Sequence, residues 1–264
     1  MESMHYYPNT IARSLKTEAT MSIGMIIQDL SNTHLASFCN GVENIVSRKG
    51  YLSLIATTNN NAEIEEKYLR LMLERRVDAL VVHGCGENNA LIARISHQLP
   101  MVAVYRRIND PDYRGDYIDH ENQFTSYTLT KHLLDNGHRR IFIINGPQNT
   151  STGLERFQGF CRAMAEYGYP VDESYPYRYD SDYTRQGGID GCRRMLSQNV
   201  LPTALIATNP ETLLGALTYL RTRKVSIPED LSVVSCADLP NASLYPVQVT
   251  CAQQDPFFFG EKAG

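Results

Sequence analysis

The sequence has no long hydrophobic run and no export leader. No stretch of its 264 residues approaches the roughly 18 apolar residues of a membrane-spanning helix. Its N-terminus also lacks a positively charged segment followed by an apolar stretch and a small-residue cleavage site. These absences argue against a membrane protein or a secreted one, and they predict a globular protein of the cytoplasm.

Signatures of several enzyme classes are missing as well. There is no GxSxG, HExxH or GxxxxGK motif, and Gly84-Cys85-Gly86 lacks the third glycine of a dinucleotide-binding loop. The cysteines form no CxxC pair, which argues against a zinc site or a disulfide framework. They are Cys39, Cys85, Cys161, Cys192, Cys236 and Cys251. We therefore expect no enzyme, no metal and no cofactor, and we expect these thiols to be small core residues.

A surplus of positive charge is also absent. Lys and Arg number 25 against 29 Asp and Glu, which gives a formal net charge of -4. A broad phosphate-binding face is therefore not expected, and any contact with nucleic acid must be local. The length and the 42% hydrophobic content are enough for one large core or two modest ones.

What the sequence does contain is a regular alternation of apolar runs and amphipathic helical patterns. Continuous apolar strands joined by such helices predict an α/β fold with parallel sheets covered on both faces. The expected strands are 23–27, 51–56, 77–83, 101–105, 141–145, 175–179, 203–207, 231–235 and 247–252. The expected helices are 34–48, 62–75, 88–98, 121–136, 152–168, 184–198 and 211–223, with a further helix beginning near Pro256.

The stretch 139–160, RRIFIINGPQNTSTGLERFQGF, organises this pattern. Its apolar strand ends at Gly146-Pro147, and a polar connection leads to a helix that carries Arg156 on its first turns. A guanidinium there can grip a small oxygen-rich molecule. We interpret Gly146-Pro147 as the crossing between two lobes. The predicted domains are 1–20 (a hinge helix and linker), 21–146 with 252–264 (the first lobe), and 147–251 (the second lobe).

A short cationic helix is predicted near the N-terminus. It spans Pro8 to Lys16, with proline at a tolerated early position. A helix of this length is unstable alone in water, so it should form only against a partner surface.

Seven collinear segments resemble those of the lactose-repressor/galactose-repressor (LacI/GalR) family. They are YPNTIARSLKT (7–17), SIGMIIQDLSN (22–32), GHRRIFIINGP (137–147), RFQGF (156–160), PTALIATN (202–209), IPEDLSVVS (227–235) and the spaced pattern P…VT…Q…G…A (246–263). The resemblance covers nearly the whole chain, and their shared order and spacing make it specific.

The resemblance implies the core of a bacterial transcriptional repressor. In this family a helix-turn-helix headpiece and a hinge helix precede a two-lobed, periplasmic-binding-protein-like core. The core binds a small effector, a sugar or glycoside, between its lobes and forms a homodimer, and effector binding biases lobe closure on operator DNA. We expect the headpiece to be missing here and the C-terminus to be truncated. The alternative is a free-standing sugar-binding protein of the periplasmic type.

Three N-terminal residues correspond to the hinge contacts of the family. The resemblance implies that Leu15 enters the minor groove of operator DNA and that Arg13 and Lys16 lie near its phosphates. The alternative is an apolar residue on an unstructured tail.

The resemblance also implies an effector site. Arg156 matches the arginine that grips ligand hydroxyls or carboxylates; the alternative is a surface arginine. Asp119 and His120 match a loop that lines the site, although Asp119 also suits a helix cap. Tyr183 lies where an aromatic ring often packs against the ligand. His34 and Leu35 occupy contact positions that are more commonly both aromatic, and His34 is also suited to a helix start.

Two departures from the family pattern bear on the ligand. Asn209-Pro210 replaces the usual Asn-Asp, which leaves Asn209 as a ligand contact but removes a carboxylate acceptor. Ser235-Cys236-Ala237-Asp238 replaces the usual Gly-x-Asp-Asp and retains only the second acid. Loss of a buried acceptor typically costs a hydroxylated ligand about 1–3 kcal/mol, so ordinary sugar binding is expected to be weakened or retuned.

Overall fold

The computed structural model describes residues 19–239 and 241–264, which divide into two compact units. Unit 1 contains the described residues up to Ser31 together with Leu35–Ile118 and Pro256–Gly264, and unit 2 contains Asn32–His34 and Asp119–Asp255. The predicted hinge helix, with Arg13, Leu15 and Lys16, lies outside the described residues.

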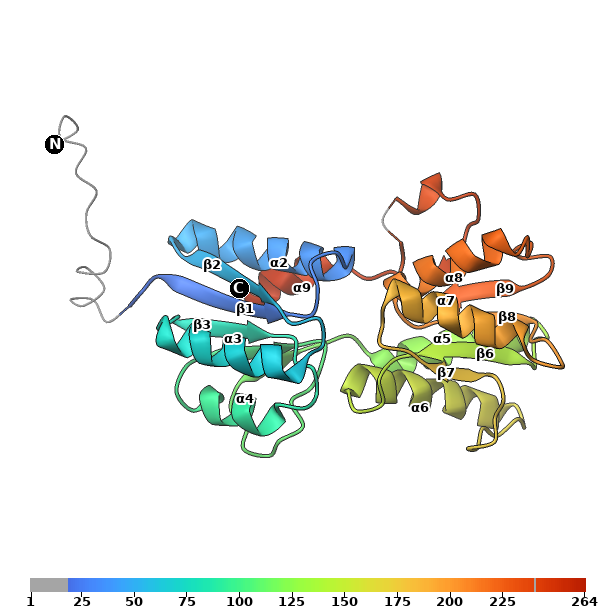
Figure 1. Cartoon of the computed structure of the whole chain (residues 1–264), viewed down its shortest axis with the longest axis horizontal. Helices are drawn as coiled ribbons and strands as arrows, with labels where there is room; N and C mark the ends of the chain where they lie inside the picture. The colour runs from blue at the N-terminus through green and yellow to red at the C-terminus, as the bar shows by residue number, and fades with distance from the viewer. Residues whose placement is uncertain (1–18, 240) are drawn as a thin grey trace. The chain divides into compact units, whose positions relative to one another are not determined.

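Unit 1 is a five-stranded parallel sheet with helices on both faces (Figure 1). Its strand order is β2-β1-β3-β4-β5, formed by β1 (Ser22–Ile27), β2 (Leu52–Thr57), β3 (Ala79–Val82), β4 (Met101–Val104) and β5 (Asp116–Ile118). Its helices are α2 (Thr33–Val46), α3 (Ala62–Glu74), α4 (Asn89–Ser96) and α9 (Pro256–Ala263), with a 3-10 turn at Ser47–Lys49.

The apolar strands of unit 1 divide their side chains between two cores. Ile26 and Leu80 belong to the cluster that α3 and α4 cover, whereas Met25 and Val81 belong to the cluster that α2 covers. Successive side chains of a strand point to opposite faces, so a strand buried on both faces must be apolar at every position. This explains why β1 reads as a continuous hydrophobic run.

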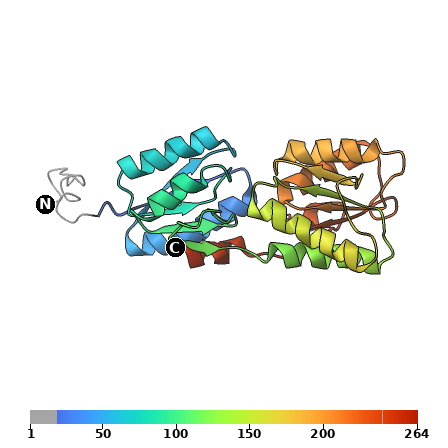
Figure 2. The same cartoon turned by 90° about the horizontal axis from the view of Figure 1, so that it is seen from below.

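Unit 2 repeats this design with its own sheet, which Figure 2 shows between two helical layers. The strand order is β10-β9-β8-β6-β7, formed by β6 (Ile141–Asn145), β7 (Arg178–Asp180), β8 (Ala204–Ala207), β9 (Ser232–Ser235) and β10 (Thr250–Cys251). The helices are α5 (Asn122–Asp135), α6 (Ser151–Glu166), α7 (Arg185–Leu196) and α8 (Pro210–Thr222), with a 3-10 turn at Ala242–Leu244.

The two faces of β6 show the same alternation. Ile141 and Ile143 pack with α5 and α6, while Phe142 and Ile144 pack with α7 and α8. All four side chains are fully buried. The predicted α/β fold with two parallel sheets flanked by helices is therefore confirmed.

The predicted crossing at Gly146-Pro147 is wrong. The chain passes from unit 1 to unit 2 between Ile118 and Asp119, and it returns at Pro256. The strand before Gly146 is β6, which pairs with β7 and β8 of unit 2. Gly146-Pro147 therefore belongs to a strand-to-helix loop inside unit 2, and a loop of this kind has the same Gly-Pro signal as a linker.

Most other differences concern element ends. The strand expected at 175–179 begins only at Arg178, and the one expected at 247–252 shortens to Thr250–Cys251. Strand β5 was not expected at all, because its three residues include Asp116 at an exposed position. Within the described part of the chain, no helix is long and apolar enough to cross a membrane.

Candidate functional site

Polar residues gather at the C-terminal edge of the unit 2 sheet. Thr208 follows β8, Cys236 follows β9, and Arg156 lies in the second turn of α6, the helix that follows β6. Thr208 and Cys236 are fully buried and Arg156 is nearly so. Ligands of parallel α/β sheets bind outside the carboxyl ends of the strands, so this edge is the expected place for a site.

The loop before α6 fixes the position of Arg156. The Thr150 hydroxyl accepts a hydrogen bond from the Gly153 N–H and caps the helix. The buried Asn145 amide donates to the Gly153 carbonyl at 3.1 Å, which ties the end of β6 to the first turn. A side chain at Gly153 would collide with the Pro147 carbonyl, so only glycine allows this close approach.

Arg156 is an interior cation. Its side chain is 8% exposed, so the alternative of a surface arginine is wrong. Its Nε donates to Asn122 Oδ1 at 2.9 Å, and its Nη1 donates to the Thr208 carbonyl. Burial opposes the charge, but Tyr183, Cys236 and Asp119 nearby outweigh it and hold the pKa of Arg156 above its usual value.

Asp119 and His120 reach the same place from the segment before α5. The Asp119 carboxylate accepts from the His120 backbone N–H at 2.7 Å and from the Asn122 amide at 2.6 Å. Since Asn122 also accepts from Arg156, its side chain links Asp119 to the arginine. The residue at the N-cap of α5 is Glu121, which makes no side-chain capping bond.

His34 and His120 face each other in unit 2. Their ring centroids are 5.6 Å apart, in an edge-to-face arrangement. Burial, followed by the charge of Arg156, lowers the pKa of His34 to about 4. Burial, followed by His34 and Arg156, lowers the pKa of His120 to about 3. Both imidazoles are therefore neutral at pH 7, each with one N–H donor.

Tyr183 packs over the loop after β6. It is 4% exposed, and its ring lies so close to Gly146 that any side chain there would overlap it. The Arg156 Cζ lies 5.8 Å from the ring centroid. Tyr183 also has a φ of 65°. A bulky residue in this left-handed region stores backbone strain, a feature that concentrates at ligand sites.

Asn209 and Leu35 lie in settings that the sequence did not reveal. The Asn209 side-chain oxygen accepts from the N–H groups of Glu211 and Thr212, so it caps α8. Leu35 belongs to unit 1, where it is 2% exposed in the core beside α2. Neighbouring residues of a helix point in different directions, so Leu35 packs inward although His34 lies in the polar cluster of unit 2.

Sequence reasoning missed two groups that hold Arg156. The first is Asn122, whose signal was its position three residues after Asp119 at a helix start. The second is the Thr208 carbonyl. It could not be predicted, because every residue type carries the same backbone acceptor. Together they take two of the five N–H donors of the guanidinium.

Unit 1 has a polar cluster of its own that was also not predicted. Arg106, 2% exposed, donates from Nη1 to Asn60 Oδ1 at 2.7 Å and to the Gly84 carbonyl at 3.0 Å. Its Nη2 donates to Gln28 Oε1 at 3.3 Å. These groups follow β1, β2, β3 and β4, at the C-terminal edge of the unit 1 sheet. A charged residue directly after an apolar strand was the available signal.

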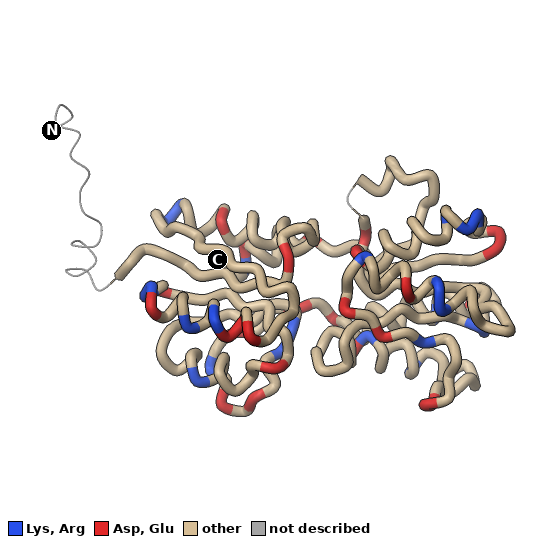
Figure 3. The backbone as a smooth tube through the Cα atoms, in the orientation of Figure 1, with Lys and Arg blue, Asp and Glu red and all other residues tan. Residues whose placement is uncertain are grey.

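Charges elsewhere are mixed rather than segregated. Figure 3 shows Lys and Arg interspersed with Asp and Glu along the chain in each unit. The described residues contain no group of three or more His, Cys, Asp or Glu that could hold a metal ion.

Two parallel α/β units with polar clusters at the strand ends define a small-molecule-binding fold of the periplasmic-binding-protein type. The family described as periplasmic binding proteins and sugar binding domain of LacI family matches residues 20–262, and the chain belongs to it. It is 32% identical over 263 residues to the HTH-type transcriptional repressor PurR of Glaesserella parasuis serovar 5 (strain SH0165). That match covers 99% of this chain and 76% of the relative.

Solved structures of transcriptional regulators have the same fold as this chain. A putative ribose operon repressor from Burkholderia thailandensis is 28% identical, with a TM-score of 0.80 over 92% of this chain and 89% of that chain. The Cra transcriptional dual regulator of Pseudomonas putida, in complex with fructose 1-phosphate, is 25% identical, with a TM-score of 0.81 over 92% of this chain and 88% of that one. The chain is thus the effector-binding part of a LacI-family transcriptional regulator, and the alternative of a free-standing sugar-binding protein is set aside.

Proposed function

We propose that the effector of this regulator is a sugar or sugar derivative held in unit 2 by the cluster around Arg156. The observation that carries this proposal is a buried guanidinium that lies with two neutral imidazoles and a strained aromatic residue at the strand ends. Ligand sites combine an apolar wall with a few fixed polar groups, and this cluster has both. The fructose 1-phosphate bound to the Pseudomonas putida regulator supports a sugar derivative.

The proposed contacts come from separate segments of unit 2. Arg156 supplies hydrogen-bond donors from α6, and Tyr183 supplies a ring face from the segment before α7. His34 and His120 supply imidazole N–H or N acceptor groups. The remaining donors of Asn209 lie next to Thr208, whose carbonyl Arg156 contacts. We do not include Leu35 among these contacts, because its side chain is part of the unit 1 core.

Regulation follows from where these contacts lie in the chain. Asp119 and His120 come directly after the crossing from unit 1. An effector that binds Arg156 and His120 restrains this segment, and restraint that differs between two conformations shifts their populations. We propose that this shift changes the affinity for operator DNA, which Arg13, Leu15 and Lys16 contact. The resemblance of 7–17 to the family hinge supports that role.

We infer that the protein is not an enzyme and acts in the cytoplasm. The relatives are transcriptional regulators. The buried thiols are also poor nucleophiles, because burial raises the pKa of Cys39 and Cys236 to about 11 and that of Cys192 to about 12. Thiols of this kind remain protonated at neutral pH.

The test of the effector site is a thermal-shift panel of sugars, glycosides, nucleobases and organic acids. We expect a specific ligand to raise the melting temperature, and we expect Arg156→Ala to weaken its binding roughly tenfold to a hundredfold, because charge-assisted hydrogen bonds are lost. Arg162→Ala is the matched control, since this arginine lies on the same helix with its side chain 62% exposed. Equal binding by all three proteins contradicts the site.

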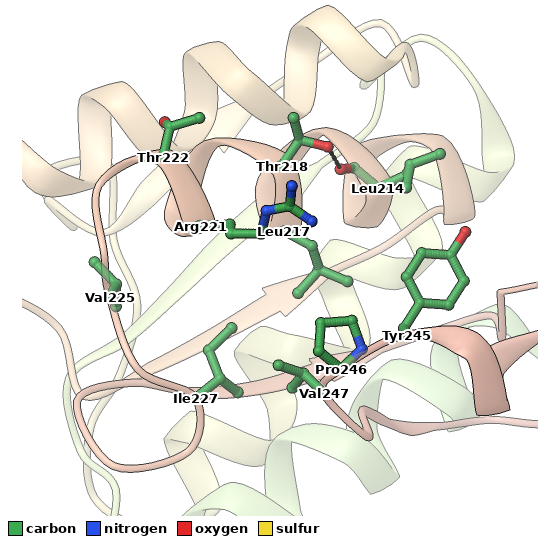
Figure 4. Close-up of a pocket in the computed structure, with 10 residues that line it drawn as sticks. All are labelled: Leu214, Leu217, Thr218, Arg221, Thr222, Val225, Ile227, Tyr245, Pro246 and Val247. Carbon is green, nitrogen blue, oxygen red and sulfur yellow. Dashed lines mark hydrogen bonds between the residues drawn. The ribbon is translucent and has the colours of Figure 1, made fainter.

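We further propose that unit 2 takes part in a homodimer through an apolar groove of about 380 Å³. Figure 4 shows Leu217 of α8 on one side of the groove and Ile227, Pro246 and Val247 on the other. Leu244, 81% exposed, is the last residue of the nearby 3-10 turn. Contiguous apolar surface of this kind marks an interaction site, and the resemblance to dimeric regulators supports a second copy as its occupant.

Leu217→Glu tests this surface. A charge placed in an apolar interface loses its hydration without gaining a partner, so we expect dimer affinity to fall by more than roughly tenfold. Sedimentation equilibrium over a concentration series measures the change. Val200→Glu, at a position 57% exposed outside the groove, is expected to leave the association unchanged. A wild-type chain that stays monomeric, or a Leu217→Glu dimer of unaltered affinity, contradicts the proposal.

A further inference from the structure

The described chain enters unit 1 through a connection that Asp78 holds in place. Its Oδ1 accepts from the Thr20 N–H at 3.0 Å, and its Oδ2 accepts from the Met21 N–H at 2.7 Å. The Thr20 hydroxyl donates to the Arg76 carbonyl at 2.7 Å, and the Asp78 N–H donates to the Ser22 carbonyl at 2.8 Å. The first described residues are therefore tied to the segment before β3 at one defined place.

Two segments flank this entry point, and we call them the entry segments. Residues 47–51 lead into β2, and residues 74–78 lead into β3. The strand order β2-β1-β3 places the starts of β2 and β3 on either side of the start of β1. Neighbouring strands are about 4.8 Å apart, so β2 and β3 are separated by about 10 Å across β1. The two entry segments thus lie on opposite sides of the entering chain.

The entry segments carry an excess of positive charge, although the whole chain has an excess of acids. Their four cations, all exposed, are Arg48, Lys49, Arg75 and Arg76. Of their two acids, Asp78 is engaged by the backbone of the entering chain, and Glu74 is exposed. Within the described residues, none of the four cations has a carboxylate partner. Figure 3 shows Lys and Arg at these ends of α2 and α3. Their charges are therefore open to a partner outside the unit.

The entry segments are close in the chain to the proposed DNA contacts at Arg13 and Lys16. Lys16 precedes Ala19, the first described residue, by three residues, and three residues span at most about 11 Å. A phosphate contacted by Lys16 is therefore near the edge of unit 1 that holds the entry segments. Duplex DNA carries one negative charge per about 1.7 Å of its axis, so further phosphates lie within reach of neighbouring cations.

We propose, building on the DNA contact proposed above, that the four cations of the entry segments form a second contact with duplex DNA. They bind backbone phosphates beside the stretch that Arg13 and Lys16 contact. Contacts of this kind add affinity without reading sequence, and they fix the orientation of a protein on the duplex. Since Asp78 ties the entering chain between the two segments, unit 1 itself is oriented on the DNA.

The first test measures how strongly the chain binds phosphates. Fluorescence anisotropy follows binding to a labelled duplex of about 30 base pairs and mixed sequence, at salt concentrations from roughly 20 to 200 mM. We expect Arg48→Gln/Lys49→Gln/Arg75→Gln/Arg76→Gln to bind roughly tenfold or more weakly at low salt. We also expect the slope of log affinity against log salt to fall by about 2 or more, because each lost phosphate contact removes about 0.9.

The matched control makes the same change of charge in unit 2. Cations at helix C-termini interact favourably with the helix dipole, which would explain the four residues without any DNA. Arg193→Gln/Arg194→Gln/Arg223→Gln/Lys224→Gln alters exposed cations in the same setting, at the C-terminal ends of α7 and α8. We expect this variant to lose less than about threefold in affinity and to keep the wild-type salt slope. Equal losses in the two variants show a general effect of charge and overturn the inference.

The second test needs no variant. Acetylation of lysines in the wild-type chain is followed by mass spectrometry with and without the same duplex. We expect the duplex to slow acetylation of Lys49 several-fold and to leave that of Lys224 unchanged. A rate at Lys49 that the duplex does not alter overturns the inference.

Arg13→Gln/Lys16→Gln separates this inference from the proposed DNA contact. If this variant binds the duplex weakly while the variant of the four cations binds as the wild type does, the proposed contact stands and the inference fails. If only the variant of the four cations loses affinity, the edge of unit 1 binds DNA and the proposed contact fails. Both fail if the wild-type chain does not bind the duplex at the lowest salt concentration.

Discussion

Gly159→Ala is expected to destabilise the protein by about 3 kcal/mol, although the same change in an unconstrained helix stabilises it by about 1 kcal/mol. A methyl group at this position of α6 would lie 2.1 Å from the Gln123 carbonyl oxygen and 2.9 Å from the Tyr127 nitrogen of α5. These are backbone atoms, so no rotamer change relieves the overlap. The two helices must move apart, which opens the core between them and the sheet.

Urea denaturation followed by circular dichroism measures this effect. The control is Gln158→Ala, at the preceding, exposed position of the same helix, where we expect a change within about 0.5 kcal/mol. A stability gain in Gly159→Ala equal to its helix propensity shows that α5 and α6 are not in backbone contact at this point. A loss of stability in Gly159→Ala but not in Gln158→Ala confirms that this glycine sets the distance between α5 and α6.

Glycines allow a similarly close approach of two helix backbones at other helix pairs. A methyl at Gly188 of α7 would meet the Thr212 carbonyl of α8 at 2.2 Å, and one at Gly215 of α8 would meet the Arg185 carbonyl at 2.0 Å. In unit 1 a methyl at Gly41 of α2 would meet the Phe257 carbonyl of α9 at 2.1 Å. Each face of the unit 2 sheet is thus covered by two helices in close contact, which bury the apolar strands completely.

Some parts of the fold could be predicted from the sequence, and others could not. The run 141–144 predicted a buried parallel strand because burial on both faces requires every position to be apolar. The glycines gave no comparable signal, since a glycine inside a helical pattern does not reveal which backbone approaches it. The crossing at Ile118 was missed for the same reason. It depends on which sheet β5 and β6 join, and pairing between distant strands is not encoded in local composition.

The candidate site was predictable in part. Arg156, Asp119, His120, Tyr183 and His34 all lie in unit 2, and its contacts bring Arg156 near Tyr183 and the two histidines near each other. Leu35 could not be distinguished from His34 by position alone, because both residues lie in the first turn of α2, which begins at Thr33. The directions of their side chains depend on where that helix begins. The role of Asn122 depends on the orientation of its amide, and Asn209 serves α8 as a cap. Residue type and spacing specify neither an orientation nor a hydrogen-bond partner.

Acid is expected to destabilise the protein through His34 and His120. Their folded-state pKa values, about 4 and about 3, lie below the value of about 6.5 in an unfolded chain. Between these limits the unfolded chain binds more protons than the folded one, so stability rises with pH. The contribution of these two histidines to the free energy of unfolding is fully present above pH 6.5 and is lost as the pH falls toward 4. From pH 6.5 to 5 each histidine contributes a loss of about 2 kcal/mol.

The free energy of unfolding at pH 7, 6 and 5, obtained from urea titrations, measures this loss. Carboxylates also titrate toward acid, so the decisive quantity is the difference in pH slope between the wild type and His34→Gln/His120→Gln. We expect the double variant to retain about 3–4 kcal/mol of the stability that the wild type loses between pH 7 and 5. His132→Gln, at an exposed position, is the single-histidine control for the substitution itself. Parallel slopes for the wild type and the double variant would show that both imidazoles titrate normally. The statement that His34 and His120 form a buried, neutral pair beside Arg156 would then be wrong.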